Sequence, residues 1–366
     1  MSKIVIDARE LRRSTGRYVE RLIHYLQQVD QQNDYIILLT PKDMDTWQPT
    51  NPRFTKLACP FKEFTFAEQI GYKRQLDGLQ ADLVHFGMVQ QPVLYRGRVV
   101  TTMQDLTTIR FRNPAKNWLV FTLKRWVYIW VNKRVAHKSA AIITPTEFVR
   151  QDVAAYTHVD AGKITVTHEA ADDFDEAAAE IPFFADKTFI MSDGRPRPHK
   201  NMRRVIEAFA RIHESYPDLY LMLTGKRDDS FGPYQKQIDS LGLTNFVVQT
   251  DFIPDGQLKW AMQHTQAYIW ASLSEGFGLP PLEAMINGAP VVSSDASCMP
   301  EVLGKAAHYF DPLDVNDMAG KIGEVLDDAA LRQKLIRSGK EQVQKYSWKR
   351  MAQQTLAVYN DVLKTK

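Results

Sequence analysis

Two glutamates flank a short stretch of the chain that is rich in glycine and proline. Glu275 and Glu283 are eight positions apart in SEGFGLPPLEAM, residues 274–285. Glycine adopts backbone conformations that other residues avoid, and it lets a ligand approach the main chain closely. Carboxylates accept hydrogen bonds from neighbouring hydroxyls such as those of a ribose diol. The pattern predicts a loop that binds a polyhydroxylated ligand, and the structural alternative is a tight turn with a capping glutamate.

The elements around this loop suit a phosphorylated ligand. A strand is expected at 267–271, and a helix is expected to start at Pro281, to carry Glu283 in its first turn and to end before Gly288. Ligands of open parallel sheets bind outside the carboxyl ends of the strands. The free N–H groups and positive dipole end of the following helix favour phosphate. The loop and the helix together therefore predict a binding place for hydroxyls next to one for phosphate.

Strand-like runs alternate with helical patterns through most of the chain. Continuous apolar strands separated by helices such as 201–216 are typical of parallel sheets that are covered on both faces. The acidic, alanine-rich segment 172–182 is the best linker between two such series. The expected strands are 3–7, 35–39, 82–86, 98–102, 140–144 and 163–167, then 187–192, 219–223, 246–250, 267–271 and 290–294.

Composition indicates an ordinary soluble enzyme. The 366 residues suffice for two domains with real cores. A net charge of +3 does not by itself point to nucleic acid, and the two cysteines, Cys59 and Cys298, suit a reducing compartment. We find no run of 18 apolar residues and no signal-peptide pattern, so a cytoplasmic location is expected.

The stretch from Glu275 to Glu283 resembles the E-x7-E motif of retaining glycosyltransferases of the GT-B fold, in glycosyltransferase family 4. Further segments resemble that family in the same order along nearly the whole chain, and E-x7-E is the most specific of them. These segments are 14–22 with Gly16, 143–153, 163–172, 192–209 with Arg195 and Lys200, 221–226 with Gly225, and 346–359.

The resemblance implies an α/β protein with two Rossmann-like parallel-sheet domains that face a cleft. Residues 1–180 would form an acceptor-binding domain, on which the helix at 346–366 packs back. Residues 181–345 would form the domain that binds the nucleotide-sugar.

The resemblance also implies roles for individual residues. Glu283 would bind the nucleotide ribose, and Glu275 would hold the donor sugar without becoming a covalent nucleophile. Arg195 and Lys200 would stabilise the charge that grows on the leaving diphosphate, because a guanidinium fork and an ammonium both suit phosphate oxygens. No metal and no further cofactor would then be needed. The remaining donor-binding positions would be Gly276, Phe277, Gly278 and Leu279, with Gly16, Gly225, Gln104 and Asp105.

Structural alternatives remain for these residues. Arg195 and Lys200 could be solvated surface cations, and Glu275 could serve only the architecture of the loop. The segment DFD, 173–175, mimics the metal-binding motif of another glycosyltransferase fold, but it lies in the linker.

One position departs from the family pattern. The family commonly has a histidine–aspartate pair near the donor sugar, and in the matching stretch, 99–111, Gln104 replaces the histidine while Asp105 remains. Glutamine can donate and accept hydrogen bonds but cannot take a proton. Either this histidine is not a proton carrier here, or the protein is slower, or its role has changed. His85 lies on a different expected strand, where a structural role is the simpler interpretation.

The expected activity is retaining, metal-independent transfer of a hexose to a hydroxyl of a glycan or lipid-linked glycan. The segments 198–201 and 66–72 look most like bacterial polysaccharide-assembly mannosyltransferases, which favours GDP-mannose as the donor. The alternatives are a hexosyltransferase of the same fold that uses a UDP-hexose, and a nucleotide-sugar-binding protein without transfer activity.

The segment 110–138 is basic and aromatic. It has eight Lys or Arg residues, six aromatic residues and no Asp or Glu. One interpretation is peripheral contact with the anionic inner face of a membrane, and the other is a mostly buried helix whose cations reach solvent. The cations do not gather on one face at helical spacing, so the pattern does not decide between the two. Nothing else in the chain supports nucleic-acid binding.

Overall fold

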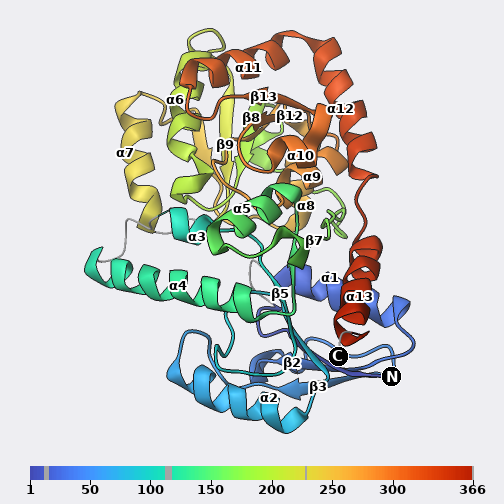
Figure 1. Cartoon of the computed structure of the whole chain (residues 1–366). Coiled ribbons are helices and arrows are strands. Elements are labelled where there is room, and N and C mark those ends of the chain that lie inside the picture. Colours follow the sequence, from blue (N-terminus) through green and yellow to red (C-terminus); the bar gives the residue numbers. More distant parts are fainter. Residues whose placement is uncertain (12–15, 112–117, 227–228, 365–366) are drawn as a thin grey trace. The chain divides into compact units, whose positions relative to one another are not determined.

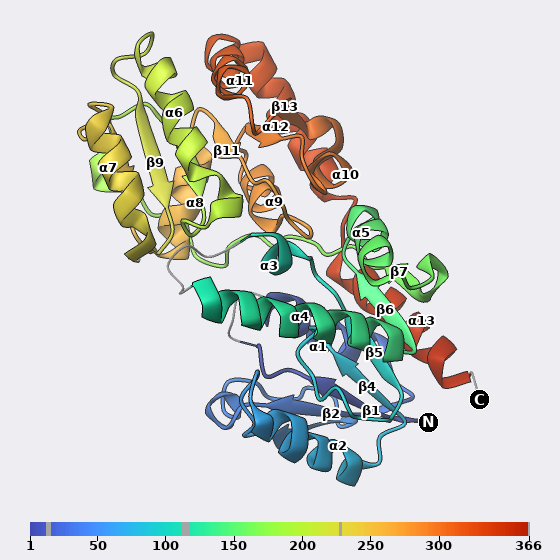
Figure 2. The same cartoon turned by 60° about the vertical axis from the view of Figure 1, so that its left-hand side comes forward.

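The chain folds into two compact units, each built on a parallel sheet (Figure 1, Figure 2). The computed structural model describes residues 1–11, 16–111, 118–226 and 229–364. The prediction of an α/β protein with two parallel-sheet domains is confirmed. The first unit comprises Met1–Ile109, Trp118–Glu169 and Ser347–Lys366, and the second comprises Arg110–Asn117 and Ala170–Tyr346.

The first unit contains a seven-stranded sheet in the order β3-β2-β1-β4-β5-β6-β7. All its neighbouring strands are parallel, and its central strands are buried along almost their whole length. The strands are β1 Lys3–Asp7, β2 Asp34–Leu39, β3 Phe54–Ala58, β4 Leu83–Phe86, β5 Val99–Thr102, β6 Ala141–Thr144 and β7 Ile164–Val166. The sequence analysis missed β3, because this edge strand alternates buried and exposed residues instead of forming an apolar run.

The helices of the first unit cover the sheet and include the end of the chain. Helix α13 packs against α1, and α4 packs against α5 and β5. The helices are α1 Gly16–Val29, the π-helical turn η2 Glu68–Tyr72, α2 Lys73–Leu79, α3 Thr107–Arg110, α4 Trp118–Lys138, α5 Glu147–Thr157 and α13 Trp348–Lys364, with the 3-10 turns η1 Pro41–Asp43 and η3 Ala161–Lys163. Among the described helices, none combines the length and hydropathy that crossing a bilayer requires.

The second unit contains a six-stranded parallel sheet in the order β10-β9-β8-β11-β12-β13. The strands are β8 Phe189–Asp193, β9 Tyr220–Thr224, β10 Val247–Gln249, β11 Tyr268–Trp270, β12 Val291–Ser294 and β13 Ala307–Phe310. The last of these was not predicted, because its four residues are only partly apolar and partly buried.

Two long helices of the second unit begin with aspartate side-chain caps. Asp314 accepts from the main chain of Asn316 at the start of α11, and Asp328 accepts from Ala330 at the start of α12. The helices are α6 Met202–His213, α7 Gly232–Ser240, α8 Asp255–His264, α9 Leu279–Ile286, α10 Met299–Leu303, α11 Val315–Asp327 and α12 Ala329–Val343, with the 3-10 turns η4 Pro182–Phe184, η5 Pro198–Lys200, η6 Asp229–Phe231 and η7 Gly304–Ala306.

The expected linker 172–182 is fixed to the second unit. Lys259 on α8 pairs with Asp173 at 2.9 Å, and the main-chain N–H of Gly256 donates to Glu176 at 2.9 Å. The compact second unit therefore begins at Ala170, ahead of the predicted limit at residue 181.

Each sheet has one position where the direction of chain progression reverses. In the first sheet β1 lies between β2 and β4, and in the second sheet β8 lies between β9 and β11. Ligands of open parallel sheets bind at such switch points, beyond the carboxyl ends of the strands. The topology therefore offers one candidate site in each unit, after β1 and β4 and after β8 and β11.

Candidate active site

The switch point of the second sheet brings together a cation and a carboxylate from distant segments. Lys200 lies at the end of η5, after β8, and Glu275 lies in the loop after β11. The Lys200 ammonium donates to Glu275 Oε1 at 2.7 Å, and the two side chains are 20% and 15% exposed. Two of the residues predicted for the site thus form a partly buried ion pair.

Lys200 is held in place by the strand beneath it. Its Nζ lies 4.1 Å from the centroid of the Trp270 ring, a cation–π contact at the end of β11. The main-chain N–H of Leu273 donates to the carbonyl of His199 at 2.7 Å, so the loop after β11 is tied to η5. Burial lowers the pKa of His199 to about 4, although Glu275 acts in the opposite direction. The His199 imidazole is therefore uncharged at neutral pH.

Buried polar groups lie at the ends of the two central strands. Burial raises the pKa of Asp193, whose Oδ1 accepts from Thr224 Oγ1 at 2.8 Å, and Lys200 partly opposes that rise. The Tyr268 hydroxyl and the Trp270 Nε1 are buried, and neither has a hydrogen-bond partner in the described part of the chain. Sequence analysis did not single out these three residues. For Asp193 and Trp270, the position at or next to the carboxyl end of a predicted strand is the signal that could have identified them.

The loop that carries Glu275 is anchored to the segment after β12. The main-chain N–H of Glu275 donates to Ser297 Oγ at 3.0 Å, and that hydroxyl donates to the Glu275 carbonyl at 2.9 Å. Cys298 Sγ also donates to this carbonyl, at 3.3 Å. Ser297 takes a positive φ of 63° to make these bonds. This anchoring fixes the position from which the Glu275 side chain reaches Lys200.

Gly278 occupies a position that only glycine suits. Its φ is +88°, and a Cβ placed there would lie 2.6 Å from Met299 Cε. Helix α9 begins at Leu279 and not at Pro281 as predicted, so both prolines follow the first helical residue. Gly288, at φ +82°, lies beyond the helix end at Ile286 as expected.

The neighbours of Gly278 position the loop further. Phe277 is buried, and its ring makes an edge contact with Tyr346 at a centroid distance of 5.3 Å. Gly276 directly precedes it and follows Glu275. Gly276, Phe277 and Gly278 thus connect Glu275 to Leu279, the first residue of the helix.

Glu283 is the fifth residue of α9, just past the first turn in which it was expected. Its side chain is buried, and its carbonyl accepts from both the main-chain N–H and the side-chain amide of Asn287. Glu275, Glu283 and Asp193 all raise the pKa of the Tyr268 hydroxyl, after the larger effect of burial. The two glutamates of the motif thus lie near one buried tyrosine, the first residue of β11.

Arg195 and Gly225 lie in the same unit, but the structure does not join Arg195 to the ion pair. The Arg195 side chain is exposed and makes no ion pair with a described residue. Gly225, at φ +120°, brings the end of β9 close to the Gly194 carbonyl, and a Cβ on Gly225 would lie 2.7 Å from that oxygen. Close main-chain packing thus explains this glycine without a ligand.

The remaining predicted residues, Gly16, Gln104 and Asp105, lie in the first unit. Gly16 is buried at the start of α1, where a Cβ would overlap the carbonyl of Glu10. Asp105 Oδ1 accepts from the main-chain N–H of Thr107 at 2.7 Å and so caps α3. Gln104 follows β5, and its buried Nε2 forms no hydrogen bond of normal geometry with a described residue.

The Gln104 amide lies beside a buried carboxyl group that sequence analysis missed. Burial raises the pKa of Glu169 to about 7, while Gln104 and then Arg17 lower it. Glu169 follows β7, and Tyr18 on α1 also lies near it. His85 is not part of this group, because it is fully buried between Thr102 and Tyr359.

Glu169 should make the stability of the first unit depend on pH. A carboxyl whose folded pKa is raised binds more protons in the folded chain, so its contribution to stability is present at low pH and is lost as pH rises through 7. We expect the free energy of unfolding of Glu169→Gln, relative to that of the wild type, to rise by about 1 kcal/mol as the pH goes from 6 to 8. Urea unfolding at both pH values measures this difference. Glu20→Gln, an exposed position on α1, is the control. Parallel pH dependences of Glu169→Gln and the wild type would contradict the assignment.

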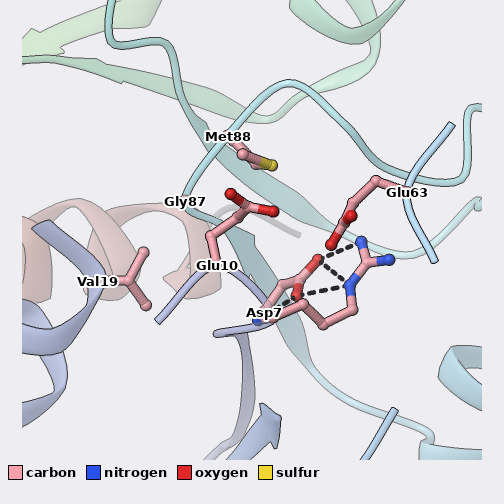
Figure 3. A pocket seen from close by; sticks show the side chains of 7 residues that line it. Asp7, Glu10, Val19, Glu63, Gly87 and Met88 are labelled. Carbon is pink, nitrogen blue, oxygen red and sulfur yellow. Dashed lines mark hydrogen bonds and ion pairs between the residues drawn. The ribbon is translucent and has the colours of Figure 1, made fainter. Parts of the chain in front are cut away.

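The switch point of the first sheet holds a pocket around a buried arginine (Figure 3). Arg9, two residues after the end of β1, donates from Nε to Asp7 Oδ1 at 2.9 Å and from Nη2 to Asp7 Oδ2 at 2.7 Å. The side chains of Glu10 and Glu63 line the same pocket, with Gly87 after β4. Sequence analysis missed this pocket, although DARE, 7–10, begins at the last residue of the first predicted strand.

No group of three or more His, Cys, Asp or Glu residues in the described ranges is arranged to hold a metal ion. In the DFD segment, Asp173 instead forms the ion pair with Lys259.

Two family models match adjacent parts of the chain. The model described as Glycosyltransferase Family 4 matches residues 15–173, and the model described as Glycosyl transferases group 1 matches residues 173–342. The two matches divide the chain near the beginning of the second compact unit.

Several curated relatives are bacterial mannosyltransferases. The MMP alpha-(1->4)-mannosyltransferase of Mycolicibacterium hassiacum is 28% identical over 266 residues, which cover 68% of this chain and 61% of the relative. The O-antigen chain mannosyltransferase B of Escherichia coli is 28% identical over 230 residues, or 60% of each chain. The matches thus span less than two thirds of these relatives.

Solved structures share the fold over the whole chain. Sucrose-phosphate synthase from Thermosynechococcus elongatus has a TM-score of 0.76 and 17% identity, and covers 100% of both chains. HepE of Anabaena, solved in complex with UDP and glucose, has a TM-score of 0.72 and 16% identity, and covers 99% of this chain and 100% of its own. With the two family models together spanning residues 15–342, the chain belongs to glycosyltransferase family 4 and has the GT-B fold.

Proposed function

We propose that the protein transfers a hexose, with mannose favoured, from a nucleoside-diphosphate sugar to a hydroxyl of a glycan or lipid-linked glycan. The observation that carries the proposal is the ion pair of Lys200 and Glu275 at the switch point of the second sheet. It joins the two segments that supply phosphate-binding cations and hydroxyl-binding carboxylates. Membership of the family and the relatives named as mannosyltransferases support this function.

The donor would lie across the loop after β11. Lys200 and the exposed Arg195 would bind the diphosphate, and Glu283 would accept from the ribose hydroxyls. Glu275, with the main chain from Gly276 to Leu279, would hold the sugar. At about 4 Å and an effective dielectric near 20, each cation–phosphate pair contributes about 4 kcal/mol before desolvation. Lys200 must then exchange part of its bond to Glu275 for a phosphate oxygen.

The reaction would proceed with retention of configuration. The acceptor oxygen forms a bond to the anomeric carbon while the bond from that carbon to the β-phosphate oxygen breaks. Attack from the face that the diphosphate leaves retains the configuration, and the hydroxyl proton passes to the departing phosphate. Cations that strengthen their contact as charge grows on the phosphate lower the barrier.

The acceptor would bind to the first unit. Asp7, Glu10 and Glu63 line a small pocket at the β1/β4 switch point, and their carboxylates mark the end of the sheet at which acceptor hydroxyls would bind. The ion pair between Arg9 and Asp7 fixes one side of this pocket.

Turnover should survive EDTA, because Lys200 and Arg195 would supply the positive charge that a metal would otherwise bring to the diphosphate. The measurement is release of nucleoside diphosphate from the preferred donor, with and without chelator. Complete loss of activity in EDTA that Mg²⁺ or Mn²⁺ restores would contradict a mechanism that uses cations of the chain alone.

Thermal-shift measurements with GDP, UDP and ADP test the donor class. A ligand that binds only the folded state raises the melting temperature by mass action. Stabilisation by GDP above the others supports GDP-mannose, and stabilisation by UDP supports the alternative hexosyltransferase. Gln104, at the usual position of a histidine, motivates the second alternative, a binding protein without transfer activity. Stabilisation by none of the three nucleotides would contradict the proposed site.

A further inference from the structure

Large apolar side chains are exposed in two segments of the first unit. One segment is the turn before α2 together with η2, and the other is the middle of α4. In both segments the exposed fraction lies between 55% and 88%, which is unusual for aromatic side chains without a partner. The side chains are Phe64, Phe66 and Ile70 in the first segment, and Trp126, Val127 and Trp130 in the second.

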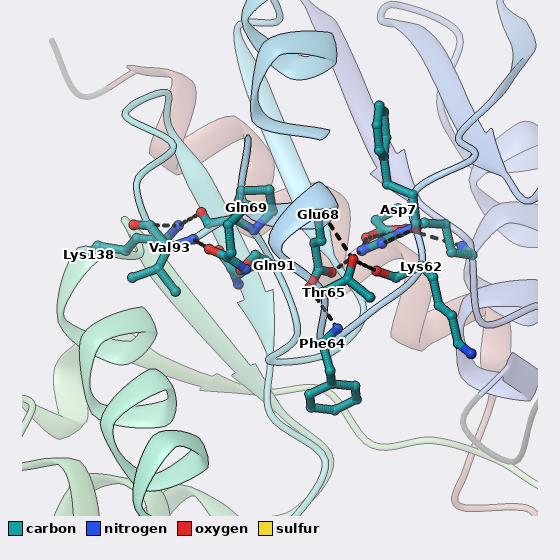
Figure 4. A network of polar contacts seen from close by, with 12 residues as sticks. Asp7, Lys62, Phe64, Thr65, Glu68, Gln69, Gln91, Val93 and Lys138 are labelled. Carbon is teal, nitrogen blue, oxygen red and sulfur yellow. Dashed lines mark hydrogen bonds and ion pairs between the residues drawn. The ribbon is translucent and has the colours of Figure 1, made fainter. Parts of the chain in front are cut away.

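The turn around Phe64 is held in a strained conformation by buried polar groups (Figure 4). Phe64 has a φ of +62°, which is rare for a bulky residue and persists only when the surroundings enforce it. Its main-chain N–H donates to Glu68 Oε2 at 3.0 Å, and Arg9 Nη2 donates to Glu68 Oε1 at 3.0 Å. Thr65 Oγ1 donates to the carbonyl of Lys62 at 2.7 Å. The fold therefore fixes a turn whose phenyl groups it leaves in solvent.

Helix α4 presents Trp126 and Trp130 on one exposed face. Trp126, Trp130 and Arg134 follow each other at intervals of four residues, and all three are exposed. Asn132 and Val135, on the opposite side, are buried. The helix is thus packed on one side and leaves an aromatic and basic face without a partner in the described part of the chain.

The exposed charges in both segments are positive. Residues 118–138 contain no Asp or Glu, and Lys124, Arg125 and Arg134 are exposed. In 60–74, all of which the structure describes, Lys62 and Arg74 are exposed. The two acidic residues of that range, Glu63 and Glu68, are buried instead.

The loop at 89–95 fastens the two segments to each other (Figure 4). Gln69 in η2 accepts from the main-chain N–H of Val93 at 2.9 Å and donates to the carbonyl of Gln91 at 3.2 Å. Lys138, at the end of α4, donates to the carbonyl of Pro92 at 2.8 Å. Leu94, in the same loop, is 64% exposed. The exposed apolar groups are thus carried on segments whose relative positions are fixed within the unit.

We propose that these two segments, 62–70 and 124–134, dock the first unit on a membrane surface that contains anionic lipids. Aromatic side chains favour the level of the headgroups, and Lys and Arg near them attract anionic headgroups. A second copy of the chain would have to place like charges against each other across the same surface. A lipid surface satisfies the apolar groups and the positive charges together, which is why it is the occupant that we infer.

Co-sedimentation of the full chain with vesicles tests the proposal without any sugar substrate. We expect at least about tenfold tighter partition into vesicles of phosphatidylglycerol and phosphatidylcholine than into phosphatidylcholine alone, with weaker partition at high salt. The pair Phe64→Asn and Phe66→Ser, and separately the pair Trp126→Ser and Trp130→Ser, should each lower partition at least about tenfold. Asparagine is chosen because it tolerates a positive φ. Leu313→Ser, at an exposed apolar side chain of the second unit, is the matched control and should bind as the wild type does.

Other outcomes would overturn the proposal. Wild-type chain that does not prefer anionic vesicles, or folded variants that bind as well as the wild type, would contradict it. If the wild-type chain sediments as a dimer in free solution and the variants sediment as monomers, the surface binds a second copy of the chain. If the variants lose turnover on a soluble acceptor in the absence of vesicles, the aromatic groups bind the acceptor and not a membrane. Circular dichroism verifies folding, and Arg134→Glu tests the same surface by charge if a pair of substitutions unfolds the chain.

Discussion

Lys200→Ala is expected to lower kcat/KM for the preferred donor by at least about tenfold, equivalent to about 1.4 kcal/mol of transition-state stabilisation. Lys200 is partly buried, lies over the Trp270 ring and already pairs with Glu275 in the loop that would hold the donor. In the proposed mechanism its ammonium would stabilise the negative charge that grows on the leaving diphosphate. The measurement is steady-state release of nucleoside diphosphate under saturating acceptor.

A matched control separates this effect from a general loss of positive charge. Arg203→Ala removes an exposed cation of α6 in the same unit, and it should leave kcat/KM unchanged. Lys200→Ala and Glu275→Gln should also be non-additive, because each removes half of one ion pair. If Lys200→Ala turns over as fast as the wild type, Lys200 does not bind the diphosphate.

Glu283→Gln is expected to weaken binding of the free nucleoside diphosphate by about 1–3 kcal/mol. Glu283 is buried on α9, so its carboxylate can accept from ribose hydroxyls away from competing water. Glutamine preserves the size of the side chain but removes the charge that strengthens those hydrogen bonds. Calorimetry with the nucleoside diphosphate measures the change directly.

Glu275→Gln should behave in the opposite way. Glu275 is assigned to the sugar, and its carboxylate competes with the diphosphate for Lys200. Affinity for the free diphosphate should therefore stay the same or rise, while transfer from the intact donor falls. If both variants are folded and lose diphosphate affinity equally, the division of roles between the two glutamates is wrong. If neither variant changes binding or turnover, the loop is only a turn.

Strands that are buried on both faces could be predicted from the sequence, because their apolar runs are continuous. The alternating edge strand β3 and the partly buried β13 lack this signal, and both were missed. The beginning of α9 was misplaced by two residues because Leu279 already has helical geometry after Gly278. The α/β class and the two parallel sheets were nevertheless predicted correctly, since the alternation of strands and helices is a local property of the sequence.

The candidate site could be predicted only in part. The spacing of Glu275 and Glu283 and of Arg195 and Lys200 is local, whereas the bond from Lys200 to Glu275 joins positions 75 residues apart. Such contacts depend on the order of strands in the sheet, which no short motif specifies. The same holds for Glu169, which lies beside Gln104 because the chain after β7 returns to the end of β5.

The exposed face of α4 shows a further limit of sequence patterns. Cations scattered around this helix gave no clear amphipathic signal. Only the packing against α5 and β5 shows that Trp126 and Trp130 are on the free side.

Turnover of a donor panel tests the central claim most directly. The wild-type chain would be incubated with GDP-mannose, UDP-hexoses and an ADP-sugar, each with glycan and lipid-linked acceptors, and the released nucleoside diphosphate and the glycosylated product would be measured together. We expect equal amounts of both, highest with GDP-mannose, and a strong decrease in Lys200→Ala. Binding of a nucleotide-sugar without release of nucleoside diphosphate, for every donor and acceptor, would contradict the claim that this chain transfers a sugar.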